Sequence, residues 1–350
     1  MTVSRITLRP GHEISRVIRG GWQLAGGHGP VDRASTIEDM IAFAEAGITT
    51  FDCADIYTGV EELIGAFRTE YGNRQGTEAL ARIKVHTKLV PDLARLATVD
   101  RAHVRNIVDT SLQRLRAERL DLVQFHWWDY AVPLHLETVG WLNELRAEGK
   151  VSHIGGTNFD TANSLQIINS GVDLVSMQVQ YSLIDLRPER LLAKAAVENN
   201  MAILCYGTVA GGFLGDRWLG QPEPQHPLEN RSLTKYKLII DDFGGWDLFQ
   251  ALLRCLRGIA DRHGSDIATV ASAAMLQRPG VSAVIVGARN RSHLPRNVAI
   301  SALDLTAQDL SDINAIQAQG HVPEGDTYTL ERDRTGRHGN IIKYNLNAAS

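Results

Sequence analysis

The chain has 350 residues, of which 44% are hydrophobic and 22% are charged, as in soluble globular proteins. The formal net charge of −4 is small and no basic stripe is present, so we expect no nucleic-acid partner. No apolar run approaches ~18 residues and the N-terminus lacks a secretory signal, so we expect no membrane partner and a cytoplasmic location.

Eight short runs of β-branched and apolar residues read as strands, and amphipathic stretches separate them. In residues 100–116, Val104, Val108 and Leu115 share one face and Asp100 is a suitable N-cap, which predicts a helix. Residues 134–148 show the same pattern, and Gly149 would end that helix. The predicted strands are 16–20, 48–53, 83–88, 122–126, 153–157, 174–178, 202–205 and 283–286.

The regular alternation of strands and helices predicts a parallel sheet. Eight such units is the count of an α/β (β/α)8 TIM barrel. The alternative is a doubly wound sheet, which usually carries a G-x-G-x-x-G motif after its first strand. No such motif follows residues 16–22, so we predict a single barrel domain over residues 1–350.

Three segments fall outside the repeat. Residues 2–10 predict a small strand before the barrel, and residues 211–246, rich in glycine, proline and asparagine, predict a long loop insertion. Residues 320–350 form a polar C-terminal tail with little periodicity. Long loops on the catalytic face of a barrel are usually functional, whereas a polar terminus is often disordered, and both interpretations of the tail stay open.

Four polar residues lie at or just beyond the ends of predicted strands, where an α/β barrel keeps its chemistry: Asp52, Tyr57, Lys88 and His126. Reduction of a carbonyl places negative charge on its oxygen, and Tyr57 can supply a proton there. Lys88 is expected to lower the pKa of the phenol, and Asp52 to keep Lys88 charged and aimed. His126 is expected to hydrogen-bond the substrate carbonyl or to assist proton transfer.

Several blocks in this order resemble the aldo-keto reductase superfamily over nearly the whole chain. They are 20–23 (Gly-Gly-Trp-Gln), 51–57, 61–65, 86–88, His126, 156–159, Gln178, 287–289 and Asn297. Residues 124–130, 206–208 and 244–246 are similar to a bacterial and plant-plastid branch of that superfamily with no settled substrate. The resemblance implies that Tyr57, Lys88, Asp52 and His126 are the catalytic residues.

The resemblance also implies a nicotinamide cofactor lying across the barrel mouth, held without a Rossmann domain. Thr157, Asn158 and Gln178 would hold the carboxamide, and Tyr206 would stack on the ring. The loop after the eighth strand would bind phosphate through Arg289 and Arg291. The remaining implied cofactor contacts are Gly21, Trp22, Asp52, Gly207, Gly287 and, for adenine, Asn297.

The cofactor loop departs from the family at two positions. His293 stands where many NADPH-specific members carry an arginine, and Arg296 stands where a glutamate is usual. We nevertheless predict NADP, with NAD as the alternative, because a bidentate arginine suits a 2′-phosphate.

Aromatic residues would line the substrate pocket, together with parts of the 211–246 loop. They are Trp22, Trp127 and Trp128, and since the last two adjoin, only one is expected to face the mouth. We predict no metal site, because Lys88 among the histidines and aspartates would repel a cation.

The predicted function is NAD(P)H-dependent reduction of an aldehyde, ketone or sugar carbonyl to the alcohol, with Tyr57 as general acid. One alternative is a regulatory cofactor-binding subunit with little turnover, and another is an NAD-linked sugar lactol dehydrogenase that runs the reverse direction. The partner would be a small-molecule carbonyl or sugar. The sequence determines neither the substrate nor the oligomeric state.

Overall fold

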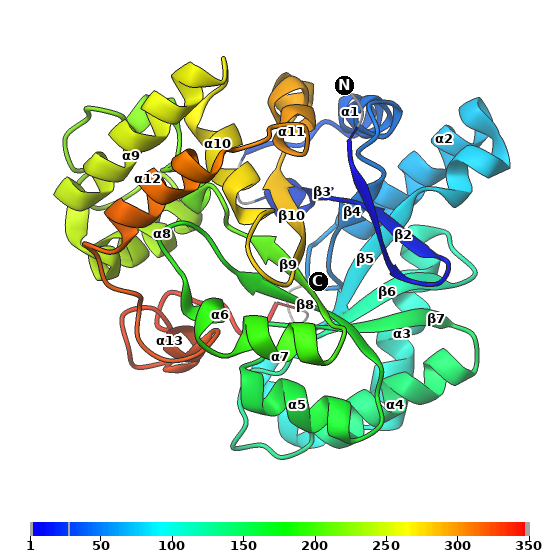
Figure 1. Ribbon diagram of the computed structural model, residues 1–350. Helices are drawn as coiled ribbons and strands as arrows, with labels where there is room; N and C mark the ends of the chain where they lie inside the picture. The colour runs from blue at the N-terminus through cyan, green and yellow to red at the C-terminus, as the bar shows by residue number, and fades with distance from the viewer. Residues whose placement is uncertain (1–2, 27–28, 347–350) are drawn as a thin grey trace.

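The computed structural model, which describes residues 3–26 and 29–346, contains a closed barrel of parallel strands (Figure 1). Around the barrel the order is β10-β3-β4-β5-β6-β7-β8-β9, so β10 closes against β3. The expected (β/α)8 barrel is therefore confirmed. The strands are β3 (Val17–Gly20), β4 (Thr50–Asp52), β5 (Lys84–Leu89), β6 (Leu120–Phe125), β7 (Val151–Thr157), β8 (Leu174–Gln180), β9 (Ala202–Tyr206) and β10 (Val281–Gly287).

Helices surround the barrel, and local sequence explains where several of them begin. The Asp100 carboxylate accepts from the backbone N–H of His103 at the start of α3, as an N-cap should. Thr306 and Asp309 form a reciprocal capping box at the start of α12. The helices are α1 (Arg33–Glu45), α2 (Val60–Ala81), α3 (Arg101–Leu115), α4 (His135–Ala147), α5 (Thr161–Asn169), α6 (Arg187–Arg190), α7 (Leu192–Glu198), α8 (Arg231–Phe243), α9 (Gly245–Arg262), α10 (Ile267–Met275), α11 (Leu294–Ile300), α12 (Ala307–Gln317) and α13 (Thr329–Arg332).

An antiparallel hairpin closes the end of the barrel at which the strands begin. It consists of β1 (Arg5–Arg9) and β2 (His12–Ser15), so the strand expected in residues 2–10 is present and has a partner. Leu8 and Ile14 pack against Ile18, Leu204 and Ala283 inside the barrel. Ligands therefore have access to the barrel interior from the opposite end, where the strands finish.

Residues 211–246 are not a loop throughout. Asn230 caps α8 by accepting from the N–H of Leu233, and Leu233, Ile240 and Phe243 bury one face of the helix. The glycines and prolines outside this stretch hid its helical pattern, so the loop expectation is wrong for Arg231–Phe243.

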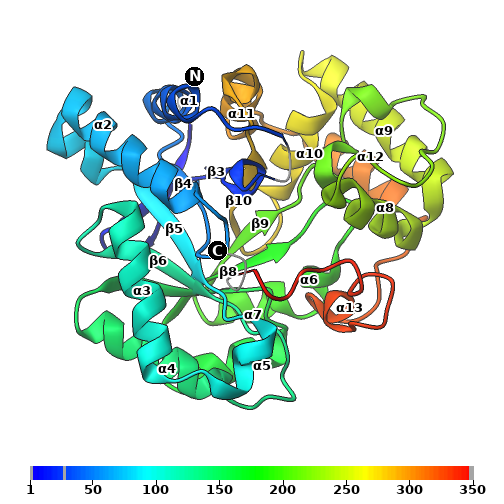
Figure 2. The same cartoon turned by 180° about the vertical axis from the view of Figure 1, so that it is seen from behind.

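The C-terminal tail is ordered across residues 320–346 and lies over the mouth of the barrel. It runs from α13 toward the centre of the strand ends (Figure 2). The tail contacts segments that follow two different strands: Tyr344 O accepts from Leu93 N after β5, and the Asp326 carboxylate accepts from Thr161 N after β7. Of the two interpretations of the tail, terminal disorder therefore does not apply to residues 320–346. Among the described residues, no helix is long and apolar enough to cross a membrane.

Candidate active site

The structure brings the four predicted catalytic residues together at the barrel mouth. Asp52 ends β4, Lys88 lies near the end of β5 and His126 follows β6 directly. The Lys88 Nζ donates to both carboxylate oxygens of Asp52, at 2.9 and 2.8 Å, and to the Cys53 carbonyl at 2.8 Å. The same Nζ lies 5.1 Å from the centre of the Tyr57 ring. Lysine, carboxylate and phenol thus form one compact cluster.

Burial and neighbouring charges shift the pKa values of Lys88 and Tyr57 in opposite directions. Burial lowers the pKa of Lys88, but the charge and hydrogen bonds of Asp52 together with the neighbouring Tyr57 and Cys53 raise it above its ordinary value, so the lysine stays cationic. For Tyr57, burial raises the pKa above its ordinary value, and the Lys88 charge only partly offsets this. Lys88 thus acts on the phenol in the expected direction, but burial has the larger effect, so the net pKa of Tyr57 is raised rather than lowered. Tyr57 is a protonated donor here, which is the form needed at the start of a reduction.

Two glutamines complete the hydrogen bonding of Asp52. Gln178 Nε2 donates to Asp52 Oδ1 at 2.6 Å, and Gln124 Nε2 donates to the same atom at 3.0 Å. Gln124 was not among the predicted site residues, although it lies two positions before His126 on β6 and so points into the barrel. The two amides fix the carboxylate that in turn aims Lys88.

His126 lies almost completely buried against the end of β7. Its Nδ1 is 2.9 Å from the carbonyl oxygen of Thr157, and its ring meets Trp128 and Tyr328 edge-on. Burial, together with the nearby Arg332 charge, lowers the pKa of His126 to about 3. The ring is therefore neutral at physiological pH.

The residues expected to hold the nicotinamide end of a cofactor lie side by side. Asn158 adopts a left-handed conformation (φ 61°) just after β7, and its Oδ1 accepts from the Tyr206 hydroxyl at 2.9 Å. Gly207 has φ +76°, and a Cβ there would lie 2.2 Å from the Tyr236 hydroxyl, so the turn after β9 requires glycine. The Gln178 amide N–H groups already serve Asp52 and Gln124, so only its carbonyl oxygen is available to a cofactor.

Gly21 and Trp22 follow β3 at the same rim. A Cβ on Gly21 would lie 2.7 Å from the Asp52 carbonyl oxygen, so glycine is required for this close approach. The Trp22 ring meets the Tyr57 ring edge-on at 5.2 Å and is 41% exposed, which suits either a cofactor or a substrate contact.

The two arginines expected to bind phosphate in the loop after β10 differ in whether they are already paired with a carboxylate. Arg291 is paired with Asp39 at 2.7 Å, whereas Arg289 is exposed and pairs with no carboxylate of the described residues. Gly287, which ends β10, is exposed beside them. Asn297 is buried, and its Nδ2 has no hydrogen-bond partner in the described chain. An orphaned amide and an unpaired arginine are what a dinucleotide site requires, so these residues fit the cofactor.

The two adjoining tryptophans have different surroundings. Trp128 lies against His126 and donates from Nε1 to Pro91 O. Trp127 is fully buried, donates to the carbonyls of Asp129 and Val132, and packs on Phe125. The expectation that Trp127 contacts substrate is therefore corrected, because consecutive residues point in opposite directions.

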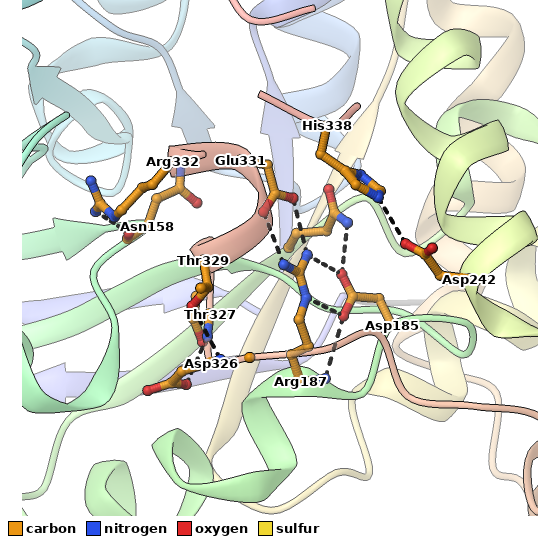
Figure 3. A network of polar contacts seen from close by, with 12 residues as sticks. Asn158, Asp185, Arg187, Asp242, Asp326, Thr327, Thr329, Glu331, Arg332 and His338 are labelled. Atoms are coloured by element: carbon orange, nitrogen blue, oxygen red, sulfur yellow. Dashed lines mark hydrogen bonds and ion pairs between the residues drawn. The ribbon is translucent and has the colours of Figure 1, made fainter. Parts of the chain in front are cut away.

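The tail contributes side chains that the sequence did not indicate (Figure 3). Glu331 forms a buried ion pair with Arg187, which also binds Asp185. Arg332 donates to the carbonyls of Trp127, Trp128 and Asn158, and so ties the end of β6 to the end of β7. The tail had no periodicity to mark these positions, so no sequence signal would have found them.

A lysine from α8 also reaches the site. Lys235 Nζ lies 5.1 Å from the Tyr206 ring centre, with the Tyr236 and Tyr328 rings at 5.7 and 5.8 Å. It escaped the sequence analysis because it lies in the segment expected to be loop. Among the described residues, no group of histidines, cysteines and acids is placed to hold a metal ion.

Comparison with known proteins agrees with this geometry. A model of the aldo/keto reductase family matches residues 16–318. The aldo-keto reductase YhdN of Bacillus subtilis is 28% identical over 312 residues, covering 87% of this chain and 91% of that protein. The NADH-specific methylglyoxal reductase of Escherichia coli is 25% identical over 320 residues, covering 85% and 92%. The structure of a glycerol dehydrogenase from Gluconobacter oxydans superposes with a TM-score of 0.76 at 23% identity, covering 93% and 97%.

Proposed function

This chain belongs to the aldo/keto reductase family, and from that premise we propose that it reduces a small aldehyde, ketone or sugar carbonyl with Tyr57 as general acid. Family members are NAD(P)-dependent oxidoreductases, and so is this protein. The observation that carries the proposal is the cluster of Lys88, Asp52 and Tyr57, with a buried cation beside a protonated phenol.

The nicotinamide cofactor, when bound, supplies the hydride. The residues of this chain provide the rest of the chemistry. As negative charge develops on the carbonyl oxygen, the Tyr57 hydroxyl donates its proton to that oxygen. The phenolate left behind is stabilised by the Lys88 ammonium, which Asp52 holds in place through two short hydrogen bonds. Release of the alcohol and reprotonation of Tyr57 from solvent would complete the turnover.

Thr157, Asn158, Gln178 and Tyr206 are proposed to hold the nicotinamide, and Asn297 the adenine. Arg289 is proposed to bind a phosphate, because it is exposed and without a carboxylate partner in the described chain. We retain NADP as the preferred cofactor. Because Arg291 pairs with Asp39, Arg289 is the main cation left for the 2′-phosphate. His293, at a position where many NADPH-specific members carry an arginine, argues against NADP. A cytoplasmic location is part of the same proposal.

The decisive experiment is a panel of aldehydes, ketones and sugars, assayed with NADPH and NADH by the loss of nicotinamide absorbance and with NADP⁺ and NAD⁺ by its gain. Multiple turnovers that disappear in Tyr57→Phe would support the proposal. Binding of cofactor without turnover of any substrate would instead indicate a regulatory subunit. Turnover only of sugars with NAD⁺ would indicate a lactol dehydrogenase working in the oxidative direction.

A further inference from the structure

Lys235 is a half-buried cation at the barrel mouth, surrounded by aromatic rings. Its Nζ lies 5.1 Å from the centre of the Tyr206 ring, and the centres of the Tyr236 and Tyr328 rings lie at 5.7 and 5.8 Å. Within residues 3–26 and 29–346, no ion pair or hydrogen bond engages this ammonium group. Aromatic rings attract a cation but do not accept its three hydrogens as an oxygen would, so the group is available to a ligand.

The packing of α8 fixes the position of this lysine. Tyr236, the next residue on the helix, lies against the loop that follows β9. A Cβ on Gly207 or Gly211 would lie only 2.2 or 2.8 Å from atoms of the Tyr236 side chain, so two glycines permit this close approach. Lys235 is thus held beside the end of β9 by the fold and does not depend on a flexible loop for its place.

The tail brings a carboxylate into this region but pairs it with another cation. Glu331 lies three residues after Tyr328, and the Arg187 guanidinium binds it at 2.9 and 3.0 Å. The same guanidinium binds Asp185 at 2.7 Å (Figure 3). Neither carboxylate forms an ion pair with Lys235 in the described chain.

A second cation without an acidic partner borders the same tyrosine. The Arg332 guanidinium lies 5.6 Å from the centre of the Tyr328 ring. Its hydrogen bonds go to backbone carbonyls and to the Tyr130 hydroxyl, and it forms no ion pair with the described residues. This side of the mouth therefore presents positive charge and no unpaired carboxylate of the described chain.

These groups lie at the nicotinamide end of the proposed cofactor site. Tyr206 is the residue proposed to stack on the nicotinamide, and the Tyr328 ring meets the His126 ring edge-on at 5.7 Å between centres. A substrate carbonyl must lie beside the nicotinamide to receive the hydride, whereas phosphate is assigned to Arg289 in the loop after β10. An anion that meets Lys235 is therefore expected to belong to the substrate.

We propose that Lys235 binds a carboxylate of the substrate, so that the site selects aldehydes and ketones that carry an acidic group away from the carbonyl. This inference rests on the proposed function and names the substrate class of the same site. An ammonium group is a compact charge with three donors, and its attraction for a carboxylate is stronger where rings exclude water. Lys235 is a specificity residue and takes no part in the transfer of the hydride or the proton.

Two acids, each compared with its methyl ester, test the contact: 4-formylbenzoate, which is stiff, and 4-oxobutanoate, which is flexible. We expect Lys235→Met to lower the ratio of kcat/KM for acid over ester by about 10–100-fold in at least one pair, as for the loss of one charge-assisted hydrogen bond. The inherent reactivity of each carbonyl cancels in this comparison. Lys235→Arg should keep part of the preference, and Lys194→Met, at an exposed position of α7, should keep all of it. Unchanged ratios in both pairs would overturn the inference.

The phosphates of the cofactor are the other anions that Lys235 could meet. Quenching of tryptophan fluorescence measures the affinity of the parent and of Lys235→Met for NADPH. A tenfold or larger loss of this affinity, together with equal losses of kcat/KM for acid and ester, would assign Lys235 to the cofactor and overturn the inference.

The contact can also be measured without turnover, by calorimetric titration with benzoate and with its neutral analogue benzamide. Benzoate should bind the parent more tightly than benzamide does, and Lys235→Met should remove most of this difference while Lys194→Met keeps it. Equal benzoate affinity in the parent and Lys235→Met would overturn the inference. If no carbonyl is reduced at all, the proposed function fails, while the titration still decides whether Lys235 binds a carboxylate.

Discussion

Arg187 and Glu331, separated by 144 positions in the chain, form a bidentate ion pair at 2.9 and 3.0 Å with both side chains almost fully buried. Asp185 lies on the other side of the same guanidinium. The pair joins the segment after β8 to α13, so it fastens the tail over the barrel mouth (Figure 3).

Glu331→Gln should loosen the tail. Removing one charge of a buried pair costs about 3 kcal/mol here, the lower end of the usual range, because Asp185 continues to neutralise Arg187. We expect a lower melting temperature and faster proteolytic cleavage within residues 320–346. Glu324→Gln, the same change at an exposed position of the tail, is the matched control. Equal behaviour of the two variants would show that the ion pair does not hold the tail.

The contribution of Glu331 should depend on pH in a defined direction. Burial raises the pKa of Glu331, but the charge and hydrogen bonds of Arg187 together with the Lys235 charge lower it from 4.5 to about 2. A depressed carboxyl pKa contributes stability above the unfolded value, and this stability is lost as the pH falls through the folded value. The difference in melting temperature between the parent and Glu331→Gln should therefore be full above about pH 5 and shrink toward pH 2. A constant difference across this window would contradict the assignment.

Tyr57→Phe should remove most of the turnover and leave cofactor binding intact, because the phenol acts on the substrate oxygen. Loss of one positioned acid typically costs ~10²–10⁴ in rate. Steady-state assays measure kcat, and quenching of tryptophan fluorescence measures the affinity for the cofactor. Near-normal kcat on a substrate that the parent reduces would assign the acid to another group.

Lys88→Met should be as damaging as Tyr57→Phe, because the phenolate depends on the ammonium beside it. Asp52→Asn should cost less, since it acts through Lys88. The double variant of Tyr57 and Lys88 should be little slower than either single variant. Circular dichroism checks the fold, and additive losses in kcat would mean that the two residues act separately.

Arg289→Ala should weaken NADPH binding by about 10–100-fold, as expected for one charge-assisted contact of ~1.5–3 kcal/mol, and NADH binding much less. The two cofactors differ only in the 2′-phosphate. Arg254→Ala, at an exposed position of α9, is the control. Equal losses for both cofactors would place Arg289 on the shared pyrophosphate, and a parent that prefers NADH would identify His293 as the better indicator.

Sequence patterns by themselves predicted the eight strands and the place of each proposed catalytic residue at a strand end, because both are local properties. A β-branched run forms a strand wherever it lies, and parallel strands put their final residues at one end of a barrel. Asp52, Lys88 and His126 could thus be placed together without knowing any contact between them. The helix over 231–243 was missed since its pattern is bounded by turn-forming residues on both sides.

Only the tertiary structure decided the properties that depend on partners distant in the chain. It put Trp128 at the mouth and Trp127 in the core, which adjacency alone could not choose. It raised the pKa of Tyr57 because burial depends on everything that covers the ring. It also showed the partners of Glu331 and Arg332, because a polar tail without periodicity does not indicate which part of the protein it contacts.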